Sequence, residues 1–144
     1  AAAPMPSVEA LEDSGIAAVN AARRAQGRRA LAVDPILAEI ARPHAEDMLA
    51  RSYFDHVSPE GRNPGDRVPA ALQPALVWVA ENLWRGRFAD LPDVDSTTRR
   101  MVDDWLASPD HREAMLREGA TEMGLGIARD RHTVVGVLLL ARGR

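Results

Sequence analysis

Apolar residues recur at helical spacing in the first third of the chain. The first such stretch covers residues 7–26 and the second covers residues 35–51. Asp34 caps the second stretch, and Pro35 occupies its first helical position, where a missing N–H costs least. Pro43 falls inside this helix and is expected to kink it, because proline removes one backbone donor. The pattern therefore predicts two long amphipathic helices.

A third helix is expected from a cap at Asp95 or Ser96 to about residue 107. A short fourth helix is expected to follow, with Ser108 as its cap and its end near Glu118. The inward stripe of the third helix and the apolar run near the end of the chain predict five core residues: Trp105, Leu106, Val134, Leu138 and Leu140.

Strands are expected at residues 77–85, 124–128 and 133–141. The first is interrupted by the polar pair Glu81-Asn82, and the last two form a hairpin. Residues 133–141 are apolar almost throughout, which is typical of a central strand buried on both faces. Residues 55–75 hold four Pro and two Gly and predict a long ordered loop with one helical turn. Together these elements indicate the α+β class.

Composition limits the classes of protein that fit. A chain of 144 residues with 46% hydrophobic residues fits one soluble-type core, and no apolar run is long enough to span a bilayer. The net charge of −3 implies no general attraction to phosphate backbones, so no nucleic-acid partner is expected. The absence of Cys excludes disulfides.

The first residues carry a weak signal about processing. Residues 1–6 are expected to form a flexible N-terminal segment, with residues 7–144 as a single domain. The segment lacks the apolar core of a signal peptide, but its small residues resemble the stretch left at or after signal cleavage. A chain boundary chosen by an experimenter is an equal alternative.

Three residues stand inside distinctive local phrases and carry the chemistry. They are His56, Glu81 and His111. Two imidazoles and one carboxylate are the ligand set of an open zinc site, with a fourth position left for water or substrate. The three are too far apart in sequence for one turn or helix, so only a folded domain can bring them together.

Four phrases in order resemble the bacterial branch of the CAP superfamily, also called SCP-like domains. They occupy residues 54–61 (F-x-H-x-S-P-x-G), 81–83 (E-N-[IL]), 105–112 (W-x-x-S-P-x-H-R) and 124–128 (G-x-G-x-A). The resemblance runs from about residue 8 to residue 143. It implies a three-layer α/β/α sandwich with a mainly antiparallel central sheet.

The resemblance also implies a cleft lined by two His and two acidic residues. His56, Glu81 and His111 match three of these positions, and Ser108 stands where the fourth acid is expected. Asn82 is expected to hold cleft backbone through its side-chain amide. A divalent metal such as zinc is the cofactor that this cleft suggests.

Each site residue also has a structural interpretation. His56 suits a turn cap with Ser58, Glu81 suits an ion pair with one of the arginines, and His111 suits a capping arrangement with Ser108. His44 lies on an apolar helix face and is interpreted as a core histidine. The acidic pair at residues 103–104 is interpreted as a solvated helix face.

Two classes of function remain. The first is a non-enzymatic, extracytoplasmic binding module, monomeric and secreted or periplasmic, for a small ligand, lipid or peptide. It is favoured because the chain has no G-x-S-x-G or H-E-x-x-H phrase. The second is a metal-dependent hydrolase in the same cleft, in which zinc activates water. That mechanism needs a second carboxylate as general base, and the sequence offers none at the expected position.

Overall fold

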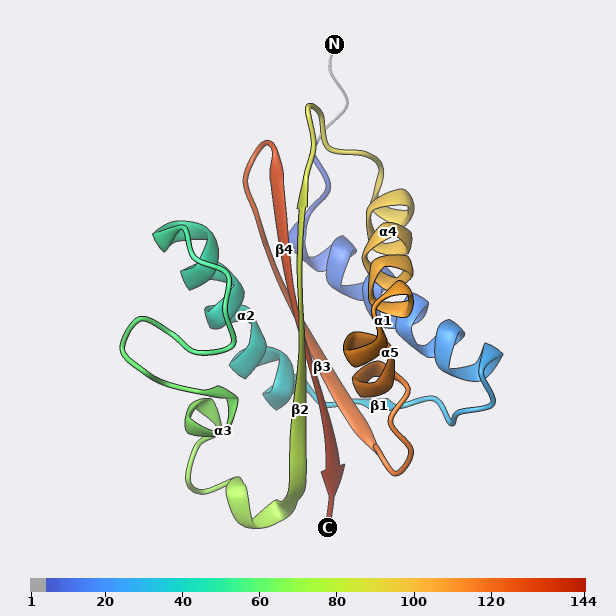
Figure 1. The fold of residues 1–144 in the computed structure, drawn as a ribbon, viewed down its shortest axis with the longest axis vertical. Helices are drawn as coiled ribbons and strands as arrows, with labels where there is room; N and C mark the ends of the chain where they lie inside the picture. Colours follow the sequence, from blue (N-terminus) through green and yellow to red (C-terminus); the bar gives the residue numbers. More distant parts are fainter. Residues whose placement is uncertain (1–4) are drawn as a thin grey trace.

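A computed structural model describes residues 5–144 of the chain, so most of the predicted flexible segment lies outside the described residues. The described chain combines helices and strands (Figure 1). Its helices are α1 (Val8–Ala25), α2 (Pro35–Arg51), α3 (Pro64–Arg67), α4 (Val94–Ala107) and α5 (Pro109–Met115), with a 3-10 turn at Gln73–Ala75. Its strands are β1 (Ala32–Val33), β2 (Leu76–Arg87), β3 (Glu122–Arg129) and β4 (Thr133–Gly143).

The strands form one mixed sheet in the order β1-β3-β4-β2. β1 pairs with β3 in parallel, and the other two pairings are antiparallel. Helices α1, α4 and α5 cover one face, and α2 and α3 cover the other (Figure 1). The expected three-layer α/β/α architecture with a mainly antiparallel sheet is confirmed. β1 was not predicted, because a strand of two residues leaves no pattern in the sequence.

β4 lies in the centre of the sheet and is buried on both faces, as its apolar run predicts. Val134, Leu138 and Leu140 join the core beneath α1 and α4. The alternate residues, including Val135 and Val137, join a second core beneath α2. Trp105 is also fully buried, whereas Leu106 is only partly buried.

Two glycines let α2 lie directly on β3. A Cβ built on Gly124 would come 2.2 Å from the backbone nitrogen of Ala38, and one on Gly126 would come 2.2 Å from that of Arg42. No side chain fits at either position. The G-x-G phrase is therefore a packing signature of this helix on this strand.

Glu12 in α1 bonds to both α2 and the open edge of β3, so it connects all three layers. Nothing in the sequence pattern indicates this contact. Glu12 is 7% exposed, and its carboxylate accepts hydrogen bonds from Arg42 Nε and Nη2, each at 2.8 Å. It also accepts the Ile127 N–H at 3.0 Å. Because β1 pairs only with the first residues of β3, this N–H has no strand partner on that side.

Several predicted boundaries need correction. β2 runs unbroken through Glu81 and Asn82, because both residues keep their backbone pairing with β4. α4 begins one residue after Asp93, ahead of the expected caps. α5 ends at Met115 and not near residue 118, and arginine side chains from α1 and the loop after it take up its last carbonyls.

Candidate functional site

His56 and Glu81 meet at the outer strand β2. His56 lies in the loop that follows α2, and its Nδ1 is 2.9 Å from Glu81 Oε1. The His56 side chain is 48% exposed, whereas the Glu81 side chain is 2% exposed. A buried carboxylate thus holds an imidazole that faces solvent.

Arg67 completes this cluster and was not among the predicted site residues. It is the last residue of α3, whose start is fixed by a capping box between Asn63 and Asp66. Arg67 Nη1 donates to Glu81 Oε2 at 2.6 Å, and Nη2 donates to the backbone carbonyl of His56. Its side chain is 10% exposed. Only the burial of Glu81 in an apolar strand hinted that some arginine would be needed.

The electrostatics of the cluster favour a charged Glu81. Burial alone would raise the pKa of this carboxyl, but hydrogen bonds from His56 and Arg67 outweigh burial and leave its pKa below the ordinary value. The hydrogen bond to Glu81 raises the pKa of His56 although partial burial opposes it. Because Nδ1 faces a carboxylate, it carries the proton, and Nε2 is the atom left to face the solvent.

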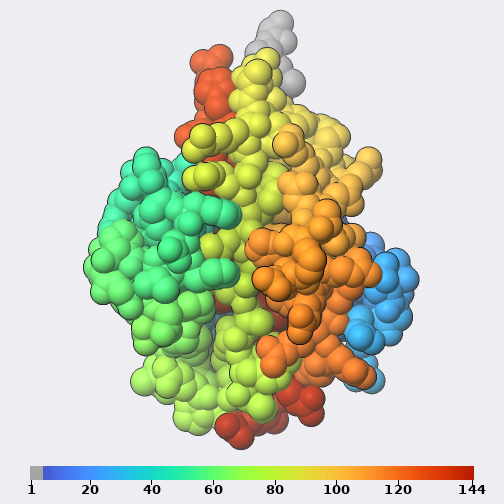
Figure 2. Space-filling model, viewed as in Figure 1, coloured from blue at the N-terminus to red at the C-terminus, as the bar shows by residue number. Residues whose placement is uncertain are grey.

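His111 stands in a second group on the other side of β2, where its hydrogen-bond partners are a hydroxyl and an amide. Its Nδ1 is 3.0 Å from Ser108 Oγ, and its backbone carbonyl accepts a hydrogen bond from Asn82 Nδ2 at 2.8 Å. Asn82 is 1% exposed. Because Glu81 and Asn82 are neighbours in a strand, their side chains leave opposite faces. β2 therefore separates the two groups, and Figure 2 shows it running between the segment with α2 and α3 and the segment with α4 and α5.

The arrangement does not fit Glu81 as a metal ligand. Both carboxylate oxygens are already engaged, and a guanidinium stands beside them. Within residues 5–144, no three His, Asp or Glu side chains are grouped so that they could hold a metal ion. The zinc set His56, Glu81 and His111 therefore stays a prediction of the sequence.

Two other predicted residues lie outside this site. His44 is 3% exposed, and its Nε2 lies 2.9 Å from the backbone carbonyl of Asp55, which confirms the core interpretation. Asp103 and Asp104 are both exposed, which confirms that they lie on a solvated helix face. Asp104 has an additional role, because its Oδ2 accepts the Trp84 indole N–H at 2.8 Å.

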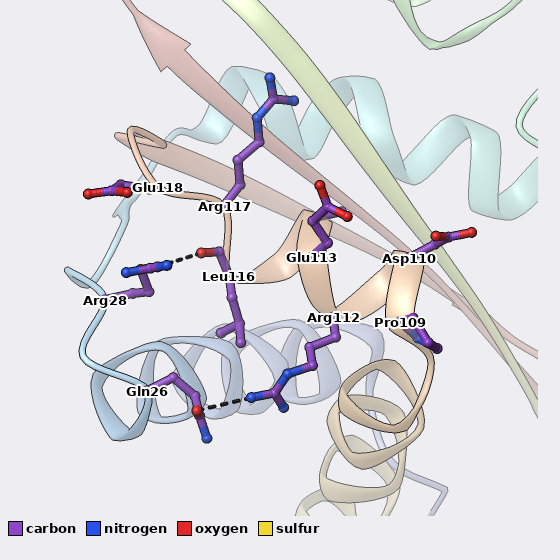
Figure 3. A pocket seen from close by; sticks show the side chains of 10 residues that line it. Gln26, Arg28, Pro109, Asp110, Arg112, Glu113, Leu116, Arg117 and Glu118 are labelled. Atoms are coloured by element: carbon purple, nitrogen blue, oxygen red, sulfur yellow. Dashed lines mark hydrogen bonds between the residues drawn. The ribbon is translucent and has the colours of Figure 1, made fainter.

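A large surface pocket, of about 990 Å³, lies away from His56 and Glu81. It sits between the end of α1 and the short helix α5 (Figure 3). Arg28 bridges its wall by donating to the Leu116 carbonyl, and Arg112 does the same by donating to Gln26. Three arginines and three acidic residues line this pocket: Arg28, Arg112 and Arg117 with Asp110, Glu113 and Glu118.

Comparison with known proteins places the chain in a family. The sequence profile of the CAP, or cysteine-rich secretory protein, family matches residues 16–140. The chain belongs to the CAP family. Its membership rests on sequence and fold and not on disulfides, since it has no cysteine.

The relatives of this CAP domain include longer proteins. The Bacillus subtilis protein YkwD is 31% identical over 120 residues, which cover 83% of this chain and 43% of the relative. The B. subtilis membrane protein YlbC is 32% identical over 79% of this chain and 30% of its own length. The chain thus spans less than half the length of these curated relatives.

Solved structures share the fold at lower identity. An extracellular protein containing an SCP domain from Bacillus anthracis has a TM-score of 0.75 at 24% identity, over 98% of this chain and 45% of its own. An outer surface protein from Borrelia burgdorferi has a TM-score of 0.77 at 19% identity, over 97% of both chains. The structure of NaASP2 with Zn²⁺ has a TM-score of 0.65 at 12% identity, over 96% of this chain and 83% of its own. No helix in residues 5–144 of the present chain has the length and apolar character to cross a bilayer.

Proposed function

We propose that this CAP domain is an extracytoplasmic, non-enzymatic binding module that takes an amphipathic small ligand, lipid or peptide around His56. One observation carries the proposal: a half-exposed imidazole is oriented by a buried ion pair, Glu81 with Arg67. Buried ion pairs contribute little net stability, because desolvation offsets their attraction. Such a pair beneath an exposed hydrogen-bonding group is typical of a site where that group must be held in place.

The surroundings of His56 suit a ligand with both polar and apolar parts. Phe54 and Val57, on either side of it in sequence, are 41% and 43% exposed. The guanidinium of Arg85 lies 4.9 Å from the centre of the Phe54 ring, a cation–π contact at the surface. A ligand that covers these two side chains would gain apolar burial, and the imidazole Nε2 would hydrogen-bond its polar end.

The alternative is a metal-dependent hydrolase that uses the same cleft. It is supported by the orientation of His56, because Nδ1 faces a carboxylate and Nε2 is left for a ligand. A related fold has also been solved with Zn²⁺. The Arg67 guanidinium beside Glu81 weighs against it, and so does the missing acid at Ser108. Location outside the cytoplasm is supported by the extracellular and outer-surface relatives.

The test follows the imidazole signals of the full chain by NMR. Monomeric dodecylphosphocholine and an apolar tripeptide with a free carboxylate serve as probes, and zinc chloride is a separate arm. We expect saturable shifts of the His56 signal and of the Phe54 and Val57 backbone amide signals with one probe, and loss of the amide shifts in His56→Gln. The matched control is His132→Gln, because His132 is also exposed but lies in the turn between β3 and β4.

Three results contradict the proposal. The first is a His56 signal that stays unchanged with every probe. The second is His56-dependent release of p-nitrophenol from p-nitrophenyl acetate after zinc is added, which supports the hydrolase. The third is an equal loss of binding in His56→Gln and His132→Gln, which places the ligand elsewhere.

A further inference from the structure

We infer that a second pocket in this domain binds the phosphate group of a phosphate ester. The pocket has a volume of about 440 Å³ and lies where the end of α1, the connection from α5 to β3 and the end of β4 meet. Four arginines line it against one acidic residue: Arg23, Arg28, Arg29 and Arg142, with Glu118. The inference does not depend on the function proposed for His56.

Arg23 is the buried base of this pocket. It is 1% exposed, and its Nε donates to the Arg29 carbonyl at 2.8 Å. Its Nη1 donates to the Met115 carbonyl at 2.8 Å and to the Arg117 carbonyl at 3.3 Å. All these acceptors are neutral. Burial lowers the pKa of Arg23, and the nearby charge of Arg28 lowers it further. The guanidinium is therefore a buried positive charge with a second positive charge beside it and no carboxylate against it.

The other three arginines are likewise not neutralised by acids. The ion pairs within residues 5–144 use Arg42, Arg51 and Arg67 as their arginines, so none of the four pocket arginines takes part. Glu118 forms no ion pair in the same residues. In a chain of net charge −3, this pocket gathers four cations against one anion. Such an excess attracts an anionic ligand.

Gly119 shapes the wall on which Arg142 rests. Its φ of +87° is a conformation that favours glycine. A Cβ on Gly119 would stand 2.8 Å from Arg142 Nη1, so the guanidinium lies directly over the Gly119 backbone. Any side chain at this position would push Arg142 away. Residues far apart in sequence are thus held together at the pocket.

The chemistry of the pocket points to phosphate. Guanidinium groups form paired hydrogen bonds with phosphate oxygens, and several of them match a doubly charged oxyanion better than a single carboxylate. The phosphate group has two sources, a soluble phosphate ester or a phospholipid head group at a membrane surface. Both present charged phosphate oxygens to the arginines. A soluble monoester carries about two negative charges and a phosphodiester head group carries one, so the monoester is expected to bind more tightly, and the experiment has an arm for each.

The test titrates the full chain with inorganic phosphate at constant ionic strength, balanced with sodium chloride, and follows the arginine side-chain NMR signals. We expect saturable binding that Arg29→Gln and Arg142→Gln each weaken by about tenfold or more, the loss of one charge-assisted hydrogen bond. Gly119→Ala is expected to weaken it through displacement of Arg142. The matched control is Arg131→Gln, which removes an exposed arginine at the other end of β4.

Two further arms identify the source of the phosphate. Glycerol phosphate that binds as inorganic phosphate does supports a soluble ester. Sedimentation with phosphatidylglycerol vesicles that depends on Arg142 supports a head group. The inference is overturned if phosphate shifts the signals no more than chloride does, or if Arg131→Gln weakens binding as much as the two pocket variants.

Discussion

The two faces of β2 carry two groups that each contain a histidine. One group contains a buried ion pair, and the other is joined by hydrogen bonds to a hydroxyl and an amide. On the side of α3, His56, Glu81 and Arg67 form a charged cluster whose carboxylate and guanidinium are almost fully buried. On the side of α5, Asn82, His111 and Ser108 form neutral hydrogen bonds. Both imidazoles use Nδ1 for a local partner. They differ in whether that partner is a carboxylate or a hydroxyl.

The charged cluster holds its imidazole in place at an electrostatic cost, whereas the neutral group mainly joins α5 to β2. The neutral group fastens α5 to β2 through a buried amide, and each bond in it is of ordinary strength. The charged cluster costs more to bury and leaves its imidazole half exposed. The comparison predicts that the charged side tolerates the loss of one partner much less well than the neutral side.

The largest effect is expected from Arg67→Met, which leaves the Glu81 carboxylate buried without its cation. Breaking a buried pair in this way costs about 3–5 kcal/mol of the free energy of unfolding at neutral pH. Denaturant unfolding measures it. The double variant Arg67→Met with Glu81→Gln should be more stable than Arg67→Met alone, since it removes the unpaired charge. If the double variant is less stable than the single one, the pair is not the source of the loss.

A smaller loss is expected from Asn82→Ala on the neutral side. It truncates a buried side chain and removes its hydrogen bond to the His111 carbonyl, and should cost about 1–3 kcal/mol. Hydrogen exchange of α5 amides should rise at the same time, because the helix loses its attachment to β2. A loss as large as that of Arg67→Met would remove the contrast between the two faces.

Ser108→Ala is expected to do less than Asn82→Ala. It removes the hydroxyl partner of the His111 imidazole, which is half-buried and gains access to water as a substitute. A typical net contribution of one such bond is about 0.5–1.5 kcal/mol. Denaturant midpoints of the two variants, measured together, give the order directly. A Ser108→Ala loss above that of Asn82→Ala would show that the serine, and not the amide, fastens α5.

The sequence predicts the elements of the fold better than it predicts the contacts within the site. The order of elements and the buried β4 follow from period and composition, because apolar runs and caps act locally. The pairing of His56 with Glu81 is different. It needs a loop, a strand and α3 to converge, and the family phrases name the first two residues without saying how they touch.

Arg67 and Glu12 show why the rest escapes sequence reasoning. Both form ion pairs across long sequence distances, and a chain with 18 basic residues offers many partners for any one carboxylate. A buried carboxylate in an apolar strand predicts that some cation is needed but not which one. β1 is missed for another reason, since a two-residue strand has no periodicity of its own.

The smallest expected effect is a pH dependence from the charged face. The pKa of His56 is raised in the folded chain, so its contribution to stability is complete below the ordinary histidine pKa, about 6.5, and is lost as pH rises through the folded value. The pKa of Glu81 is lowered, so its contribution is complete above the ordinary glutamate pKa, about 4.3, and is lost as pH falls through the folded value.

The two signs together place the strongest His56–Glu81 attraction between those ordinary values. Because the imidazole is half exposed, solvent screening limits its contribution to less than about 1 kcal/mol. Unfolding of the native chain and of His56→Gln, measured from pH 4 to pH 9, should therefore give a difference near pH 5.5 that shrinks toward pH 9. His111→Gln is the matched variant on the other face of β2, where the imidazole has a hydroxyl and not a carboxylate as its partner. Comparing the two variants isolates the part of the trend that depends on Glu81. Parallel curves for the native chain and His56→Gln would show that Glu81 is held by Arg67 alone, and the imidazole would then be a bystander to the buried pair.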